Sequence, residues 1–278
     1  MKIDAAHFEA NRIAWNQRTA VHKTSSFYDL EGFKKGLNVL NATELEALGD
    51  VAGKSLLHLQ CHFGLDTMSW ERLGAKATGV DLSEEAILLA NSIKNELQLE
   101  AEFICSNVYD IIGNESLQKR YSDDAGNWQG ADIVFTSYGT IGWLPDLDLW
   151  AKGIAHYLKP GGTFFIADFH PVLWMMDESF QYIKYPYFNT ITIEEENVGT
   201  YTDRNADIKT KEYSWNHPFT DIFTALINNG IRIESFNEYS YSHYPCFNDL
   251  EKKADGNWYI KNMEEKMPMM YAIKGIKM

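Results

Sequence analysis

The stretch of sequence that decides the fold is Ser55–Asp81, which reads SLLHLQCHFGLDTMSWERLGAKATGVD. It begins with an apolar run, breaks into a short loop that ends at Gly64, continues as a helix-like segment and closes with a second apolar run before Asp81. This order indicates a strand, a loop, a helix and a second strand that ends in an acid. A carboxylate about 20 residues past such a loop is placed to bind two ribose hydroxyls. The stretch therefore predicts a binding site for a cofactor that contains adenosine.

Alternating strands and helices continue after this stretch. We expect further strands at about 101–105, 132–136 and 163–167. Alternation of this kind indicates a parallel sheet with right-handed crossovers. Two more strand-like runs, 231–236 and 269–276, have no evident helix between them, so we expect an antiparallel pair at one edge of the sheet.

The chain is interpreted as a single domain, residues 1–278, of the α/β class. The expected architecture is a Rossmann-like, seven-stranded and mostly parallel sheet with helices on both faces and an antiparallel last strand. We divide the domain into an N-terminal helical cap (1–50), a cofactor-binding core (51–169), an inserted β-rich cap over the substrate (170–216) and the C-terminal part of the sheet (217–278).

The bulk composition argues against several classes of protein. The 278 residues carry a net charge of −14 and no dense basic run, whereas binding to a nucleic-acid backbone requires a surplus of Lys and Arg. No stretch approaches the roughly 18 apolar residues of a membrane-spanning helix, and residues 1–18 lack the apolar core of a signal peptide. Cys61, Cys105 and Cys246 do not make a disulfide framework. We therefore expect a cytoplasmic protein with neither a nucleic-acid nor a membrane partner.

The loop after the first predicted strand discriminates between adenosine cofactors. A nicotinamide dinucleotide requires three glycines there, because its pyrophosphate approaches the backbone and the helix closely. The loop Gln60–Gly64 contains a single glycine. S-adenosylmethionine (SAM) has no phosphate, so its methionine end tolerates a bulkier loop. The loop therefore favours SAM over NAD(P).

Four short segments, in this order, resemble the motifs of the class I SAM-dependent methyltransferases. The resemblance covers about residues 53–168. Leu56–Gly64 resembles the first motif, Gly79–Ser83 the second, whose acid holds the ribose hydroxyls, and Phe103–Val108 the motif that meets adenine. Leu158–Thr163, which contains a Lys-Pro-Gly-Gly turn, resembles the turn before the fifth strand. The HLQCHFG and WLPD stretches are also similar to those of a subgroup of uncharacterised bacterial methyltransferases.

The resemblance implies a set of cofactor-binding residues. Asn107 stands where the family often has Asp, and its side-chain oxygen can still accept a hydrogen bond from the adenine amino group. Tyr28 is expected to close over the methionine end, with packing of the N-terminal segment as the alternative. The residues expected to contact SAM are Tyr28, His58, Gln60, Cys61, Gly64, Asp81, Leu82, Asn107, Val108, Ser137 and Tyr138.

The first motif departs from the family pattern at its acid. His58 stands where the family has an acid that pairs with the amino group of the methionine. A protonated His58 would repel the cationic cofactor, so we expect it to stay neutral. Asp66 is expected to cap the following helix, with a role in the site as the alternative. His58, Cys61 and His62 do not obviously converge in the way that a metal site requires, so we predict no metal.

The resemblance also implies the reaction, an in-line SN2 transfer of the methyl group from SAM to a small-molecule acceptor. An oxygen or nitrogen nucleophile must lose a proton, and His170, after the fifth predicted strand, is the candidate catalytic base. His217 and His243 are weaker candidates. Residues 136–139 lack the Asn-Pro-Pro-Tyr run of enzymes that methylate nucleic-acid amino groups. The aromatic residues of 174–188 form either a substrate pocket or the core of the insertion.

Two alternatives to this function stay open. One is an NAD(P)-dependent oxidoreductase. The other is a SAM-binding protein that has lost turnover together with the usual first motif. The sequence leaves the acceptor, the attacked atom and the oligomeric state open.

Overall fold

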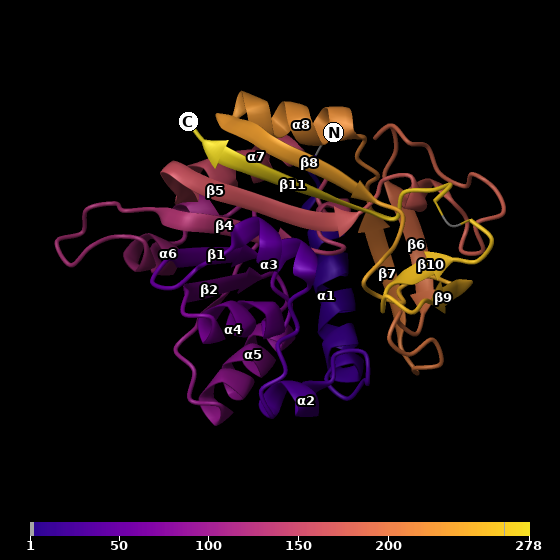
Figure 1. Cartoon of the computed structure of the whole chain (residues 1–278), viewed down its shortest axis with the longest axis horizontal. Helices are drawn as coiled ribbons and strands as arrows, with labels where there is room; N and C mark the ends of the chain where they lie inside the picture. Colours follow the sequence, from indigo (N-terminus) through magenta and orange to yellow (C-terminus); the bar gives the residue numbers. More distant parts are fainter. Residues whose placement is uncertain (1–2, 264) are drawn as a thin grey trace.

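The computed structural model describes residues 3–263 and 265–278, and its centre is a seven-stranded sheet with the order β3-β2-β1-β4-β5-β11-β8 (Figure 1). Its strands are β1 (Ser55–Leu59), β2 (Lys76–Asp81), β3 (Glu102–Cys105), β4 (Ala131–Ser137), β5 (Leu158–Phe169), β8 (Ile231–Tyr239) and β11 (Met270–Lys277). Neighbouring strands are parallel except at β11, which is antiparallel to both β5 and β8. The expected fold class and the antiparallel pair at the edge are confirmed.

Helices cover both faces of this sheet. The helices are α1 (Ala5–His22), α2 (Leu30–Lys34), α3 (Ala42–Leu48), α4 (Leu65–Arg72), α5 (Glu84–Glu96), α6 (Glu115–Arg120), α7 (Leu147–Tyr157) and α8 (Phe219–Asn228). Successive residues of β1 point to opposite faces, as in any strand. Leu57 packs in one core cluster with Trp150 of α7 and Leu226 of α8, whereas Leu56 packs in another with Trp70 of α4. A strand with both faces covered is expected to be apolar along its whole length. For this reason the apolar run of β1 indicated a strand in the sequence.

The Lys-Pro-Gly-Gly segment differs in detail from the prediction. We expected a turn before the fifth strand, but β5 already begins at Leu158. Leu158 pairs with Ala131 and Thr163 with Ile133, so the segment between them bulges out of the β4–β5 pairing. Gly161 has φ +78°, a conformation that glycine adopts without a steric penalty.

Two hairpins lie beyond the carboxyl ends of the central strands (Figure 1). The first, within the expected insertion, is β6 (Ile193–Val198) with β7 (Lys209–Ser214), and the second is β9 (Leu250–Lys252) with β10 (Trp258–Ile260). The sequence did not predict the second hairpin. Helix α1 joins the first hairpin to the core, because the Asn11 side chain donates to the Tyr213 carbonyl (2.8 Å) and accepts from the Tyr213 amide (2.9 Å).

No helix in the described part of the chain has both the length and the apolar character needed to cross a bilayer.

Candidate active site

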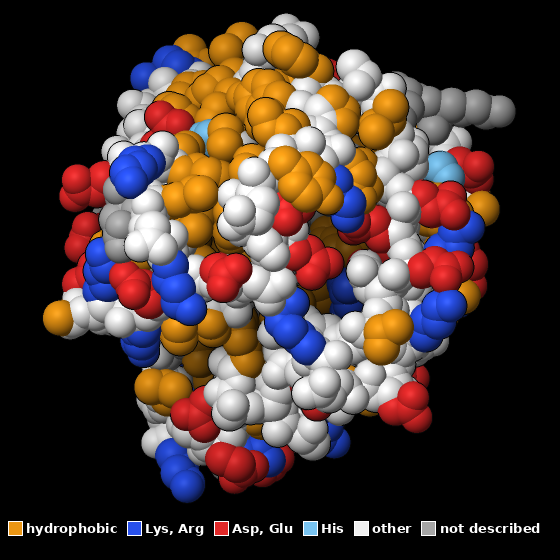
Figure 2. All heavy atoms as spheres, turned by 90° about the vertical axis from the view of Figure 1, so that its right-hand side faces the viewer, with side chains coloured by type: hydrophobic (Ala, Val, Ile, Leu, Met, Phe, Trp, Pro, Cys, Tyr) orange, Lys and Arg blue, Asp and Glu red, His pale blue; other side chains and the backbone are white. Residues whose placement is uncertain are grey.

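A cavity of about 880 Å³ lies at the carboxyl ends of the central strands. Its wall combines the ends of β1, β2, β4 and β5 with α1 and with segments of both the insertion and the loop that follows β8. Figure 2 shows the face of the molecule that carries the hairpins, with a hollow near its centre. Cavities of this size suit small ligands, and the carboxyl edge of an open α/β sheet is where such ligands bind.

The loop after β1 has the left-handed backbone conformation that glycine favours at three positions, although only one of them is a glycine. Gln60, His62 and Gly64 have φ values of +58°, +50° and +79°. These are the positions at which the family motif has its three glycines. At Gly64 a Cβ atom would lie 2.2 Å from the Phe103 ring, so any other residue would force the ring or the loop to shift. A left-handed conformation costs about 1–2 kcal/mol for residues with side chains, so the surrounding fold must hold Gln60 and His62 in place.

Asp81 is fixed at the end of β2 by backbone donors. Its Oδ2 accepts from the His62 amide (2.7 Å) and its Oδ1 from the Ser83 amide (2.9 Å). Each oxygen has a second lone pair, so both retain an acceptor position for a ligand hydroxyl. Burial raises the pKa of the Asp81 carboxyl to about 6.

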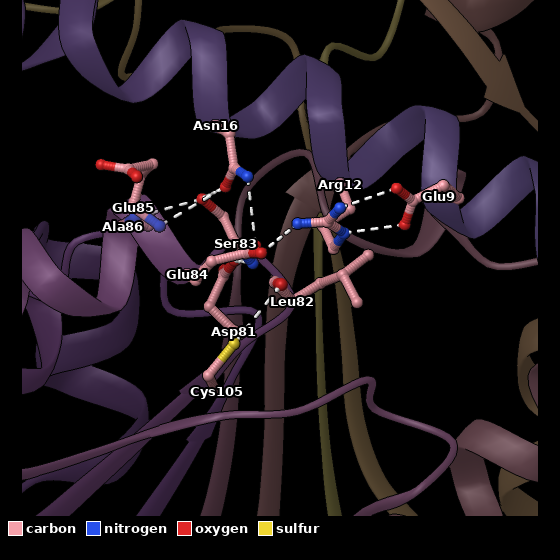
Figure 3. A network of polar contacts seen from close by, with 10 residues as sticks. All are labelled: Glu9, Arg12, Asn16, Asp81, Leu82, Ser83, Glu84, Glu85, Ala86 and Cys105. Carbon is pink, nitrogen blue, oxygen red and sulfur yellow. Dashed lines mark hydrogen bonds and ion pairs between the residues drawn. The ribbon is translucent and has the colours of Figure 1, made fainter.

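Helix α1 is attached to the turn that follows Asp81 (Figure 3). Asn16 accepts a hydrogen bond from the Ser83 hydroxyl (2.7 Å) and donates one to the Glu84 carboxylate (3.1 Å). Arg12 forms ion pairs with both Glu84 and Glu9. The N-terminal helix is therefore held against the first turn of α5, directly beside the expected ribose-binding acid.

His58 lies buried between two hydroxyl groups. Its Nδ1 is 2.8 Å from Thr67 Oγ1 and its Nε2 is 3.2 Å from Ser137 Oγ. Ser137 donates its proton to Asp66 Oδ2 at 2.9 Å, so the hydroxyl accepts from the Nε2–H of His58. Burial lowers the pKa of His58 to about 3, which agrees with the expected neutral state.

Asp66 does not have the capping role that the sequence suggested. Helix α4 begins at Leu65 with Gly64 at the N-cap position and no side-chain cap. Asp66 is the second helical residue, and its side chain turns into the cavity wall towards Ser137. Burial raises the pKa of Asp66 to about 6. The capping prediction is wrong because the left-handed Gly64 already starts the helix.

The structure brings all of the expected cofactor residues to the wall of this one cavity. Several of their polar groups already have protein partners: the Tyr138 hydroxyl donates to Glu44 (2.8 Å) and the Gln60 side chain donates to the Thr140 carbonyl (2.9 Å). The side-chain oxygen of Asn107 accepts from a backbone amide at 3.0 Å. An amide oxygen has two lone pairs, so Asn107 retains one for a ligand.

A family model described as a methyltransferase domain matches residues 57–164. This range runs from β1 to the middle of β5 and contains the loop, Asp81 and Ser137. Residues 57–164 are therefore similar to a methyltransferase domain, the class of domain that the motifs of the sequence resemble.

Similar proteins agree with this assignment. A ubiquinone biosynthesis O-methyltransferase from Xanthomonas oryzae is 26% identical over 144 residues, which are 51% of this chain and 55% of that protein. This chain thus spans about half the length of the curated relatives it matches. A SAM-dependent methyltransferase from Listeria monocytogenes has a TM-score of 0.55 at 20% identity, over 85% of this chain and 97% of that one. A geranyl diphosphate C-methyltransferase from Streptomyces coelicolor has a TM-score of 0.57 at 13% identity, over 98% of each chain. At such identities the two structures show the fold alone.

The histidine expected to be the catalytic base lies outside this cavity. His170 is buried, with Nε2 2.8 Å from the Glu238 carboxylate and Nδ1 accepting from the Val172 amide at 3.1 Å. It is not part of the cavity wall, and neither are His217 and His243. The structure therefore corrects this prediction: partners beyond β5 turn His170 away from the site.

Within the described residues, the histidines that line the cavity are His58 and His62. His62 Nε2 is 2.9 Å from His22 Nδ1, and His22 Nε2 is 2.7 Å from Thr200 Oγ1. Burial lowers the pKa of both His22 and His62, that of His22 to about 3. No three His, Cys, Asp or Glu side chains form a group that suits a metal ion in the part of the chain that the structure describes.

Helix α1 also contributes to the cavity wall, which the sequence did not predict. Arg18 forms a buried ion pair with Glu212 of β7 (2.6 Å), and its guanidinium lies 5.1 Å from the ring centre of Trp15 and 5.5 Å from that of Trp143. Trp15 and Arg18 are three residues apart, the spacing of neighbours on one helix face, so this pair was open to prediction. No pattern in the sequence indicated that Glu212 would form an ion pair with Arg18.

Some aromatic residues of segment 174–188 line the cavity, as the pocket alternative predicted, and others lie on the surface. Trp174, Phe180 and Tyr185 line the cavity. Tyr182 and Phe188 are instead exposed on the surface, at 60% and 64%. The segment therefore contributes part of the cavity wall rather than a closed core of its own.

Proposed function

We propose that this chain is a SAM-dependent methyltransferase that transfers a methyl group to a small-molecule acceptor by in-line SN2 displacement. One observation carries the proposal: Asp81 and the left-handed loop Gln60–Gly64 line the same cavity at the sheet edge where the family binds its cofactor. In this reaction the sulfonium of SAM supplies the methyl group, and the protein supplies binding and orientation.

The residues of the cavity fit the parts of SAM. Asp81 has two free acceptor positions for the ribose hydroxyls, and Asn107 and Val108 lie beyond it on the side of β3, where adenine is expected. The backbone of the Gln60–Gly64 loop would face the methionine end, and Tyr28 would cover it. The Tyr28 hydroxyl is 2.5 Å from that of Tyr201, so a hydrogen bond to the insertion would hold Tyr28 in this position.

The acceptor would lie in the part of the cavity enclosed by the insertion and by the loop after β8. Aromatic side chains dominate there, which favours an apolar or aromatic molecule. These side chains are Phe169, Trp174, Phe180, Tyr201, Tyr244 and Phe247. Aligning an acceptor with the methyl group can supply about 7–11 kcal/mol of the barrier reduction. Segment 170–216 is accordingly proposed as the acceptor cap.

Calorimetry and product analysis together test this function. SAM should bind with one site per chain, and incubation of a metabolite extract with methyl-labelled SAM should give a labelled product and S-adenosylhomocysteine (SAH). Asp81→Ala should weaken SAM binding about 100-fold, because charge-assisted hydrogen bonds to the ribose are lost. The control Asp110→Ala, at an exposed acid outside the cavity, should bind SAM normally.

The same measurements discriminate between the alternatives. Quenching of nicotinamide fluorescence on binding would support an oxidoreductase and contradict the proposal. SAM binding without SAH formation in any extract would support a SAM-binding protein without turnover. A cytoplasmic location and the absence of a nucleic-acid partner stay predictions, and fractionation and electrophoretic mobility-shift assays would check them.

A further inference from the structure

The methionine end of SAM carries an ammonium group that needs an acid, and position 58 does not provide one. In the family that this chain resembles, an acid at this position normally pairs with that group. His58 is buried and neutral, and both of its ring nitrogens are already bonded, to Thr67 and to Ser137. It therefore has neither the charge nor a free acceptor for an ammonium. If the chain binds SAM, a different acid has this role.

Most acids of the cavity wall are already neutralised or saturated. All the acids of the cavity wall in the described residues are Asp66, Asp81, Asp168, Asp177, Glu178, Glu195, Glu196 and Glu212. Three of them form ion pairs: Glu195 with Lys184, Glu196 with Lys209 and Glu212 with Arg18. Their charge is therefore compensated within the protein.

The acids without a basic partner differ in how many donors they already bind. Asp168 accepts hydrogen bonds from four backbone amides and from a threonine hydroxyl. Asp177 accepts from three backbone amides in the insertion, and Glu178 is exposed. Asp81 is proposed for the ribose. Asp66 remains, with one donor, the Ser137 hydroxyl, on Oδ2.

The position of Asp66 suits a cation at the methionine end. It comes two residues after Gly64, so its carboxylate lies beside the loop that the methionine end would follow. Ser137, at the end of β4, orients Oδ2, and within the described residues neither a hydrogen bond nor an ion pair occupies Oδ1. A buried carboxylate without a counter-charge is costly, and a bound cation removes that cost.

We propose that Asp66 binds the α-ammonium group of SAM and so replaces the acid that the first motif has lost at position 58. This assignment rests on the proposed function. Position 58 then has a different role, because the Nε2–H of His58 bonds Ser137 and Ser137 in turn orients Asp66. In this assignment the acid that binds the ammonium lies in the first turn of α4 and not in β1. Ser137 connects it by hydrogen bonds to His58, which occupies the usual position of the acid.

Three ligands that share the adenosine group separate this role from a general effect on the site. SAH has both the ammonium and the carboxylate, decarboxylated SAH has only the ammonium, and 5′-methylthioadenosine has neither. Asp66→Asn should weaken the binding of SAH and of decarboxylated SAH about 10- to 100-fold, as expected for a charge-assisted contact. The binding of 5′-methylthioadenosine should change less than twofold, which would also show that the variant is folded.

A second variant provides the matched contrast. Asp81→Asn should weaken all three ligands to a similar degree, since all three contain the ribose. An Asp66→Asn variant that binds SAH normally, or that loses 5′-methylthioadenosine as strongly as SAH, would overturn the assignment. Wild-type protein that binds 5′-methylthioadenosine and SAH equally would also overturn it. Failure of the wild type to bind any adenosyl ligand would instead refute the proposed function itself, and the assignment with it.

Discussion

The unliganded protein should become more stable when Asp66 is replaced by Asn. Burial raises the pKa of this carboxyl from 3.8 to about 6. A raised pKa means that the folded state holds the proton more tightly than the unfolded state, so stability is lost progressively as the pH rises from 3.8 to about 6, and the loss is complete above that range. At about 1.4 kcal/mol per pKa unit, the penalty at pH 7.5 is about 3 kcal/mol. Asn has no charge to bury and still accepts the hydrogen bond from Ser137.

Urea unfolding at two pH values measures this effect. Asp66→Asn should be about 3 kcal/mol more stable than the wild type at pH 7.5 and only about 1 kcal/mol more stable at pH 4.5, where the folded wild type is already protonated. Glu85→Gln, at an exposed acid in the first turn of α5, serves as control and should change stability by less than about 1 kcal/mol at either pH. The reasoning is refuted if Asp66→Asn is no more stable than the wild type at pH 7.5, or if its gain is the same at both pH values.

Three further predictions concern the same site. SAH affinity should fall as the pH drops through about 6, because Asp66 and Asp81 must both be ionised to bind their ligand groups. Tighter binding of SAH at pH 5.5 than at pH 8 in calorimetry would contradict this. His170→Ala should have SAM affinity and turnover within about threefold of the wild type, because His170 lies outside the cavity wall. Circular dichroism would show that the variant is folded, and an approximately 100-fold loss of turnover would support His170 as the catalytic base. Gly64→Ala should cost more than about 2 kcal/mol in urea unfolding, since its Cβ would overlap the Phe103 ring. Phe103→Leu should recover part of that loss, and full stability of the single variant would show that the loop relaxes freely.

The sequence predicted the sheet, and it singled out residues that line one cavity, because the signals for both are local. The apolar run of β1 and the acid that ends β2 each lie within a few residues of the feature they specify. The loop Gln60–Gly64 was predicted after β1, but its left-handed backbone at Gln60 and His62 was not, because neither residue is a glycine. The strands of the second hairpin are three residues long, too short for a periodic pattern to appear.

The errors concern side chains whose partners are distant in the sequence. Asp66 meets Ser137 across 71 residues, and no local pattern indicates that its carboxylate leaves the helix end. His170 follows β5 as expected, but Glu238, 68 residues later, holds its ring away from the cavity. Sequence position placed both residues at the correct end of the sheet. Only the packed structure shows which way each side chain turns.

The contact between Asn11 and Tyr213 has a consequence for how the protein avoids aggregation. One edge of β7 pairs with β6, and the Asn11 amide occupies the free amide and carbonyl of Tyr213 on the other edge, as a neighbouring strand would. An unpaired strand edge is a template for pairing with a second molecule. We expect a shortened protein that begins after the first helix to expose this edge and to self-associate more readily than the protein that has α1.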